Sequence, residues 1–275
     1  MRRFKQVDVF TAKPFRGNPV AVVVDAEGLD RETMQRIACW TNLSETTFLL
    51  KSAVADYKVR IFTPRQELPF AGHPTLGTAH AALESGFVPK KARLKQECAA
   101  GVFDLSVEDG RIYVLGPKPK MSEIDSTRIA SALGVPAKGL LRIDVGAVWV
   151  IGEMADAAQL AATKPDLAAI AEESVRYGLA GVTLFAPSGD PGAAIHVRSF
   201  APAHGINEDP VCGTGNIAVA AYLAQTGQQK KYGDRYLARQ GMQVGRDGQV
   251  FLRYDADGIR IGGPCVTCVD GTLAA

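Results

Sequence analysis

The chain has 275 residues, of which 47% are hydrophobic and 22% are charged, so it can bury a sizeable core in one or two domains. This composition excludes a disordered chain or a disulfide-dense scaffold. The 31 basic and 29 acidic residues leave a net charge of +2, which is too balanced for a surface that binds nucleic acid. No apolar run approaches the roughly 20 residues that cross a bilayer, and polar residues interrupt the start where a signal peptide would be apolar. We therefore expect a cytoplasmic protein with no nucleic-acid or membrane partner.

The first half of the chain predicts short strands and two helices. Strands are predicted at Asp8–Phe10, Val20–Val24, Thr46–Leu50, Tyr57–Phe62, Phe103–Val107 and Arg111–Leu115, all of them β-branched or alternating runs. Helices are predicted at Arg31–Thr41 and Leu76–Leu83. The second helix is apolar almost all round, which is typical of a helix enclosed by other elements.

The second half predicts the same kind of elements. Strands are predicted at Ala147–Ile151, Val182–Phe185, Ala194–Phe200, Val250–Tyr254 and Ile259–Ile261. The helix predicted at Ile217–Leu223 is again apolar on nearly every side. Cys265 and Cys268 have the spacing of half a zinc knuckle, but no second pair or nearby histidine completes four ligands, so we expect a strand there and no metal.

Three markers recur in the same order in the two halves, which indicates an internal duplication. Val59–Pro64 is echoed by Val197–Pro202, Pro69–Ala79 by Pro210–Ala220, and Asp109–Pro117 by Asp257–Pro264. The predicted fold class is α+β, with two pseudo-symmetric domains that each wrap a curved, mostly antiparallel sheet around a central helix. The domains are placed at residues 1–120 and 121–275, with allowance for a terminal strand that crosses over.

Both apolar helices follow a glycine-containing turn, Gly72-His73-Pro74 in one half and Gly213-Thr214-Gly215 in the other. Backbone N–H groups at a helix start attract anions. If the halves pack about a pseudo-twofold axis, the two starts would meet in a cleft that suits a small carboxylate-bearing molecule. Ordinary glycine-started helices that face water remain the alternative.

Three polar residues lack a counterpart in the other half and are therefore candidates for chemistry. Glu45 matches Gly181, His73 matches Thr214, and Asp209 matches Leu68, with Asn207–Asp209 assigned to a three-residue insertion. Each of them alone is also compatible with a turn or surface residue.

Other enzyme signatures are missing: the chain has no phosphate-binding Gly-x-x-x-x-Gly-Lys run, no dinucleotide fingerprint and no nucleophile elbow. A carboxylate, an imidazole and a second carboxylate remain. These groups serve proton transfer without a cofactor.

Four motifs resemble the phenazine-biosynthesis PhzF-like isomerase family over essentially the whole chain. They are Phe15-Arg16-Gly17-Asn18-Pro19, Asn42-Leu-Ser-Glu45-Thr, Gly72-His73-Pro74-Thr75-Leu76-Gly77 and Asp209-Pro-Val-Cys-Gly-Thr-Gly-Asn216. The resemblance implies a diaminopimelate-epimerase-like fold, a homodimer and an isomerase without a cofactor, the best-known member acting on trans-2,3-dihydro-3-hydroxyanthranilate. It also implies Glu45 as the acid/base, with Gly72, His73, Asp209, Gly213 and Thr214 around a small carboxylate substrate.

One departure concerns the substrate: the family's phenazine enzyme has serine where Thr214 stands, so an extra methyl group narrows the pocket. A racemase that uses two cysteines is an alternative, because Cys212 occupies one of the two cysteine positions, but Ala71 stands at the other. Cys212 at a helix start is expected to have a lowered thiol pKa. A non-catalytic small-molecule binding or interaction protein on the same fold is the third interpretation.

Overall fold

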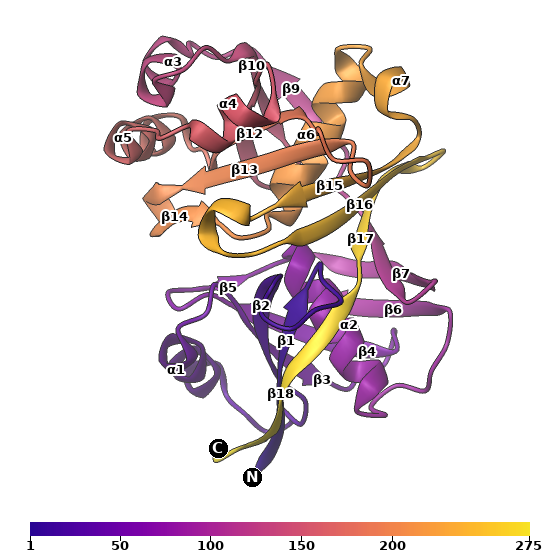
Figure 1. Cartoon of the computed structure of the whole chain (residues 1–275). Helices are drawn as coiled ribbons and strands as arrows, with labels where there is room; N and C mark the ends of the chain where they lie inside the picture. Colours follow the sequence, from indigo (N-terminus) through magenta and orange to yellow (C-terminus); the bar gives the residue numbers. More distant parts are fainter. The chain divides into compact units, whose positions relative to one another are not determined.

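The computed structural model describes residues 1–275 and divides into two compact units (Figure 1). One unit is Met1–Leu115 together with Gly262–Ala275, and the other is Gly116–Ile261. The sequence-based boundary lies at about residue 120, whereas the units divide after Leu115 and again after Ile261. Neither unit contains a helix that is long and apolar enough to cross a membrane.

The N-terminal unit is built on one mostly antiparallel sheet. Its strands are β1 (Arg2–Val9), β2 (Asn18–Val23), β3 (Thr46–Leu50), β4 (Tyr57–Phe62), β5 (Glu67–Leu68), β6 (Arg93–Cys98), β7 (Gly101–Glu108), β8 (Arg111–Leu115) and β18 (Cys265–Leu273). They follow the order β18-β1-β2-β3-β4-β6-β7-β8, with β5 paired beside β6 on the same edge of β4. Only β2–β3 and β4–β6 run parallel. The helices are α1 (Arg31–Thr41) and α2 (Gly72–Glu84).

The C-terminal unit repeats this order. Its strands are β9 (Lys120–Ser122), β10 (Lys138–Asp144), β11 (Val148–Glu153), β12 (Gly181–Pro187), β13 (Ile195–Ala201), β14 (Ile206–Asp209), β15 (Arg235–Gln240), β16 (Gly248–Asp255) and β17 (Gly258–Gly263). From β9 to β16 each pairing has the same direction as its counterpart, and β11–β12 and β13–β15 are the parallel pairs. The predicted fold class is confirmed.

The C-terminal unit has more helices than the sequence patterns predicted. They are α3 (Thr127–Leu133), α4 (Ala157–Ala162), α5 (Leu167–Tyr177), α6 (Gly213–Gln225) and α7 (Gln229–Tyr232), with 3₁₀ turns at Pro202–His204 and Met242–Val244. Residues from α3, α4 and α5 form a core cluster with Val182, Leu184 and Phe200 on the sheet. Helices α3 and α4, with seven and six residues, are too short to show a clear apolar period, whereas α5 has eleven residues and was not predicted although its apolar residues recur at helical spacing.

The arginine of the first repeat marker makes the same contacts in both units. Arg60 Nε and Nη2 donate to the Glu67 carboxylate at 2.7 and 2.9 Å, and the guanidinium lies over the Phe62 ring. Arg198 donates to Glu208 at 2.9 and 2.8 Å and lies over the phenylalanine two residues further on. The two glutamates lie on equivalent strands, β5 and β14, which supports the duplication on tertiary grounds.

The position of the insertion differs from the prediction. Because Glu208 takes the place of Glu67, residues 208 and 209 belong to the repeated strand β14. The extra residues of the second half lie between Pro202, which matches Pro64, and Glu208, in the 3₁₀ turn and the start of β14. A single turn can lengthen here without disturbing strand pairing, since loop closure costs little per added residue.

The central helices α2 and α6 are enclosed as expected. Ten of the thirteen residues in each helix are buried. Both helices begin one turn earlier than predicted, at Gly72 and Gly213. Pro74 does not break α2, because a proline in the first turn of a helix removes no intrahelical hydrogen bond.

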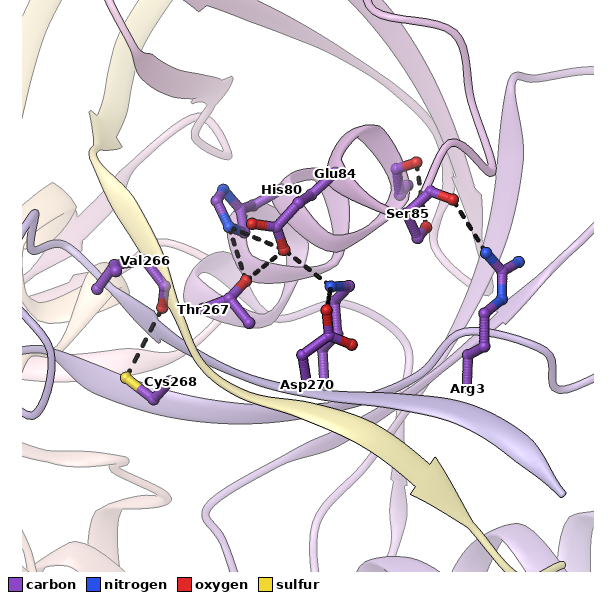
Figure 2. Close-up of polar contacts among 10 residues, drawn as sticks. Arg3, His80, Glu84, Ser85, Val266, Thr267, Cys268 and Asp270 are labelled. Carbon is purple, nitrogen blue, oxygen red and sulfur yellow. Dashed lines mark hydrogen bonds and ion pairs between the residues drawn. The ribbon is translucent and has the colours of Figure 1, made fainter.

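The C-terminal strand β18 is an integral part of the N-terminal unit, where it pairs with β1 along Arg2–Val9. Figure 2 shows the polar network that ties it to α2. Lys5 is 5% exposed, and its Nζ lies 2.7 Å from Asp270 Oδ2 and 3.0 Å from Glu84 Oε2. His80 Nε2 lies 3.0 Å from Thr267 Oγ1. These contacts join residues that are far apart in the sequence. The predicted strand at Cys265 and Cys268 is confirmed, and both residues are half-buried.

Candidate active site

Glu45 lies on the connection between α1 and β3. Helix α1 begins at the N-cap Asp30 and ends at Asn42, whose positive φ of 52° turns the chain toward the sheet. The backbone oxygen of Glu45 accepts from the Ala21 N–H at 3.4 Å, so the residue is held at the edge where β3 begins. Its side chain is only 16% exposed, and burial raises the pKa of the carboxyl above its ordinary value.

His73 is the second residue of α2 and faces this carboxyl. Its Nε2 lies 3.3 Å from Glu45 Oε2, and its side chain is 9% exposed. The start of α2 carries no side-chain cap, since the N-cap residue is Ala71. A titratable carboxyl, an imidazole and an uncapped helix start with Gly72 at its head therefore share one small region. The group can accept a proton, return it, and bind negative charge.

In the C-terminal unit, Asp209 and Gly213 lie on either side of the turn that leads into α6. Asp209 Oδ1 accepts from the Val211 N–H at 3.0 Å, and the backbone oxygen of Asp209 accepts from Gln240 Nε2 at 2.9 Å. Gln240 in turn accepts from Asn216 of α6 at 2.8 Å. The turn before the helix is thus held from both sides.

Thr214 is the second residue of α6, the same position that His73 has in α2. Its hydroxyl accepts a hydrogen bond from Trp149 Nε1 at 3.0 Å. Trp149 lies on β11 and is 4% exposed. Trp149 is not among the residues predicted from the sequence, because its match in the first half is visible only from the strand register.

The structure corrects the expectation for Cys212. This residue is the N-cap of α6, and its Sγ accepts from the Gly215 N–H at 3.3 Å. It is 4% exposed, and burial, with the Asp209 carboxylate nearby, raises the thiol pKa well above its ordinary value. Desolvation of the thiolate outweighs the helix start, so the lowered pKa predicted from sequence was wrong.

The predicted site residues therefore fall into two groups. Glu45, His73 and Gly72 meet at the start of α2, whereas Asp209, Gly213 and Thr214 gather at the start of α6. No three His, Cys, Asp or Glu side chains among residues 1–275 are grouped as metal ligands.

Comparison with known proteins shows which family the chain belongs to. The family model described as "Phenazine biosynthesis-like protein" matches residues 7–271. The chain belongs to this family. It is 36% identical to trans-2,3-dihydro-3-hydroxyanthranilate isomerase of Pseudomonas aeruginosa, covering 95% of this chain and 93% of that protein. It is also 37% identical to "Antisense-enhancing sequence 1" of Schizosaccharomyces pombe, covering 98% and 97%.

Solved structures agree with this assignment. The chain superposes on a phenazine biosynthesis protein of the PhzF family from Bacillus anthracis with a TM-score of 0.89 and 28% identity, covering 100% and 99% of the two chains. A hydroxyproline epimerase from Agrobacterium vitis, at 18% identity and a TM-score of 0.66, covering 98% of this chain and 93% of that chain, shares the fold. The protein is an isomerase of the PhzF family on an epimerase-like fold.

Proposed function

We propose that this chain is a cofactor-independent isomerase that moves a proton between two carbons of a small carboxylate-bearing substrate, with Glu45 as the acid/base. The observation that carries the proposal is the nearly buried Glu45 carboxyl with a raised pKa, 3.3 Å from His73 at an uncapped helix start. A raised pKa brings a carboxyl closer to the value that a general acid needs near neutral pH.

The proposed reaction needs no oxidant or reductant. The ionised Glu45 takes a proton from one substrate carbon and becomes a neutral carboxylic acid. The electron pair of the broken C–H bond shifts through the adjacent double bond, and the neutral Glu45 carboxyl gives a proton to the carbon at its far end. Exchange of that carboxyl proton with solvent before it is returned would carry deuterium into the substrate. His73 stabilises the carboxylate before and after the transfer, which is consistent with its distance from Oε2.

The remaining predicted residues are assigned to substrate binding. We propose that the backbone N–H groups at Gly72 and Gly213 and the hydroxyl of Thr214 bind substrate oxygens, and that Asp209 orients the substrate. Single substitutions at Asp209 and Thr214 should then raise KM more than they lower kcat.

A two-cysteine racemase is less well supported than glutamate chemistry. Cys212 and Ala71 are the N-caps of equivalent helices, so the second thiol is missing. The raised pKa of Cys212 also disfavours the thiolate that would serve as a base.

The test is proton NMR in deuterated water with trans-2,3-dihydro-3-hydroxyanthranilate and a panel of amino and hydroxy acids. We expect the wild type to exchange a carbon-bound hydrogen for deuterium and Glu45→Gln to lose about 10²–10⁴-fold of the rate. Glu32→Gln is the matched control, because Glu32 is an exposed glutamate of α1 paired only with neighbouring Arg36.

Three outcomes separate the interpretations. Exchange that survives in Glu45→Gln would refute the role of Glu45. Exchange that persists after iodoacetamide has labelled Cys212 would exclude the racemase. A ligand that raises the melting temperature of the wild type but is never exchanged would indicate a non-catalytic binding protein.

The assembly and location remain predictions from the family resemblance and composition. We propose a cytoplasmic homodimer. Light scattering should give a mass twice the 29.3 kDa of the chain, and a mass of one chain would contradict the dimer.

A further inference from the structure

The strand register shows which residues of the C-terminal unit correspond to Glu45 and its neighbour on the adjacent strand. Thr46 pairs with Phe62 in one unit and Val182 pairs with Phe200 in the other, so Glu45 corresponds to Gly181. Gly181 pairs with Trp149 on the neighbouring parallel strand. Glu45 and Trp149 therefore belong to equivalent pairs of neighbouring strands, although to different members of the pair.

The first-unit counterpart of Trp149 is a small residue. Ala21 pairs with Thr46, so Val20 is the residue opposite Glu45 and the counterpart of Trp149. In the N-terminal unit a valine and a glutamate stand side by side, and in the C-terminal unit a tryptophan and a glycine do so. In the N-terminal unit the large polar side chain follows α1, at the start of β3, whereas in the C-terminal unit the large side chain with a polar group lies on β11 and glycine stands at the start of β12.

The two side chains contact equivalent helix positions. Glu45 Oε2 lies 3.3 Å from His73 Nε2, and Trp149 Nε1 lies 3.0 Å from Thr214 Oγ1. His73 and Thr214 are both second residues of their helices. One unit thus has an acid/base at this place, whereas the other has a group that only donates.

The indole also decides which way the Thr214 hydroxyl is polarised. A hydroxyl has one hydrogen to donate, and its oxygen here already accepts from Trp149. The other nearby group is Cys212 Sγ at 3.7 Å, which is a weak partner. The hydrogen of Thr214 can therefore go to this weak sulfur partner or to a ligand atom that accepts more strongly, such as a carboxylate or carbonyl oxygen.

We infer that Trp149 is a positioning residue that holds the Thr214 hydroxyl as a hydrogen-bond donor toward a substrate oxygen, and so selects for an acceptor at the start of α6. This inference rests on the proposed function, because it assumes that Thr214 meets the substrate. Trp149 acts through Thr214 and takes no part in the proton transfer.

The kinetic test uses a double-mutant cycle with Trp149→Phe and Thr214→Val. The first change removes the N–H but keeps an aromatic ring, and the second removes the hydroxyl at nearly constant shape. We expect each to raise KM about tenfold with kcat within about threefold, and the pair to be no worse than Thr214→Val alone. Trp40→Phe is the control, since Trp40 on α1 is 76% exposed.

Two results would contradict the positioning role of Trp149, and a third would indicate a merely structural role. Additive effects of the two substitutions on KM, or an unchanged KM in Trp149→Phe, would overturn the inference. A merely structural role of Trp149 would lower the melting temperature without changing the ratio of KM to kcat.

A second measurement needs no turnover and no change at Trp149. In ¹⁵N-indole-labelled Glu45→Gln protein, the two tryptophan signals are assigned with Trp40→Phe and followed during addition of 3-hydroxyanthranilate, a stable aromatic analogue. We expect the Trp149 signal to shift, and Thr214→Val to weaken the fitted Kd about tenfold. Absence of a shift at millimolar analogue would overturn the inference. A shift together with full activity of Glu45→Gln would instead refute the proposed function alone.

Discussion

The two units share one strand order but differ at the place beside the central helix. The N-terminal unit places a buried carboxyl against His73, whereas the C-terminal unit places glycine and Trp149 against Thr214. A duplicated scaffold keeps the residues that hold the sheet together and is free to diverge where substrate chemistry differs. The divergence between the units therefore locates the candidate chemistry more sharply than either unit alone.

The arginine–glutamate pair shows the opposite behaviour, since it is kept in both units but buried to different depths. The Arg198 and Glu208 side chains are 7% and 11% exposed, whereas Arg60 and Glu67 are 24% and 21% exposed. Arg198 Nη1 also donates to the backbone oxygens of Leu160 and Thr163. The same ion pair is thus largely buried in the C-terminal unit and partly exposed to solvent in the N-terminal unit.

The largest expected effect follows from this difference in depth. Arg198→Met should lower the free energy of unfolding by about 3–5 kcal/mol, because Glu208 would be left buried without its partner. Arg60→Met should cost about 1 kcal/mol, because Glu67 is more exposed and keeps its pair with Arg31. Urea unfolding of the two variants measures both values, and equal losses would contradict the comparison.

The next prediction concerns why the C-terminal unit carries no carboxylate at position 181. A Cβ atom on Gly181 would lie 2.0 Å from the backbone oxygen of Phe200, which belongs to the neighbouring strand and cannot move freely. Gly181→Ala should therefore destabilise the protein by about 1–3 kcal/mol. Gly189→Ala is the control, because nothing lies within 4 Å of a Cβ there. Equal melting temperatures for Gly181→Ala and Gly189→Ala would contradict the steric explanation for glycine at position 181.

The smallest effect is a pH-dependent gain in stability from Glu45→Gln. A carboxyl with a raised pKa binds more protons in the folded state than in the unfolded state, so stability falls as pH rises from about 4.5 toward the folded pKa. The variant lacks this loss. It should match the wild type at acidic pH and be more stable above that range, with a gain that stops growing once the folded pKa is passed.

Thermal unfolding from pH 4 to pH 8 measures this gain, at about 2–4 °C for each kcal/mol in a chain of this size. A wild type that is stabilised rather than destabilised relative to Glu45→Gln as pH rises would mean that the folded pKa is lowered, and would contradict the environment described for Glu45.

The fold could be predicted from the sequence because its signals are local and occur twice. The apolar helices, the Val-Arg-x-Phe markers and the glycine turns recur in one order, which is enough to infer two similar units. The candidates Glu45, His73 and Asp209 were found because a different type of residue stands at each matched position: Gly181, Thr214 and Leu68. The short helices α3, α4 and α7 were missed, since four to seven residues contain too little periodicity to be recognised.

By itself the sequence determined the duplicated architecture, the family and the residue types available for chemistry, because periodicity and motif spacing are properties of neighbouring residues. Tertiary structure decided the raised pKa of Cys212 and the pairing of Trp149 with Thr214, and it placed the C-terminal strand in the first unit, which the sequence had left open. Each depends on burial or contact between residues far apart in the chain, and such distances are set only when the sheets form.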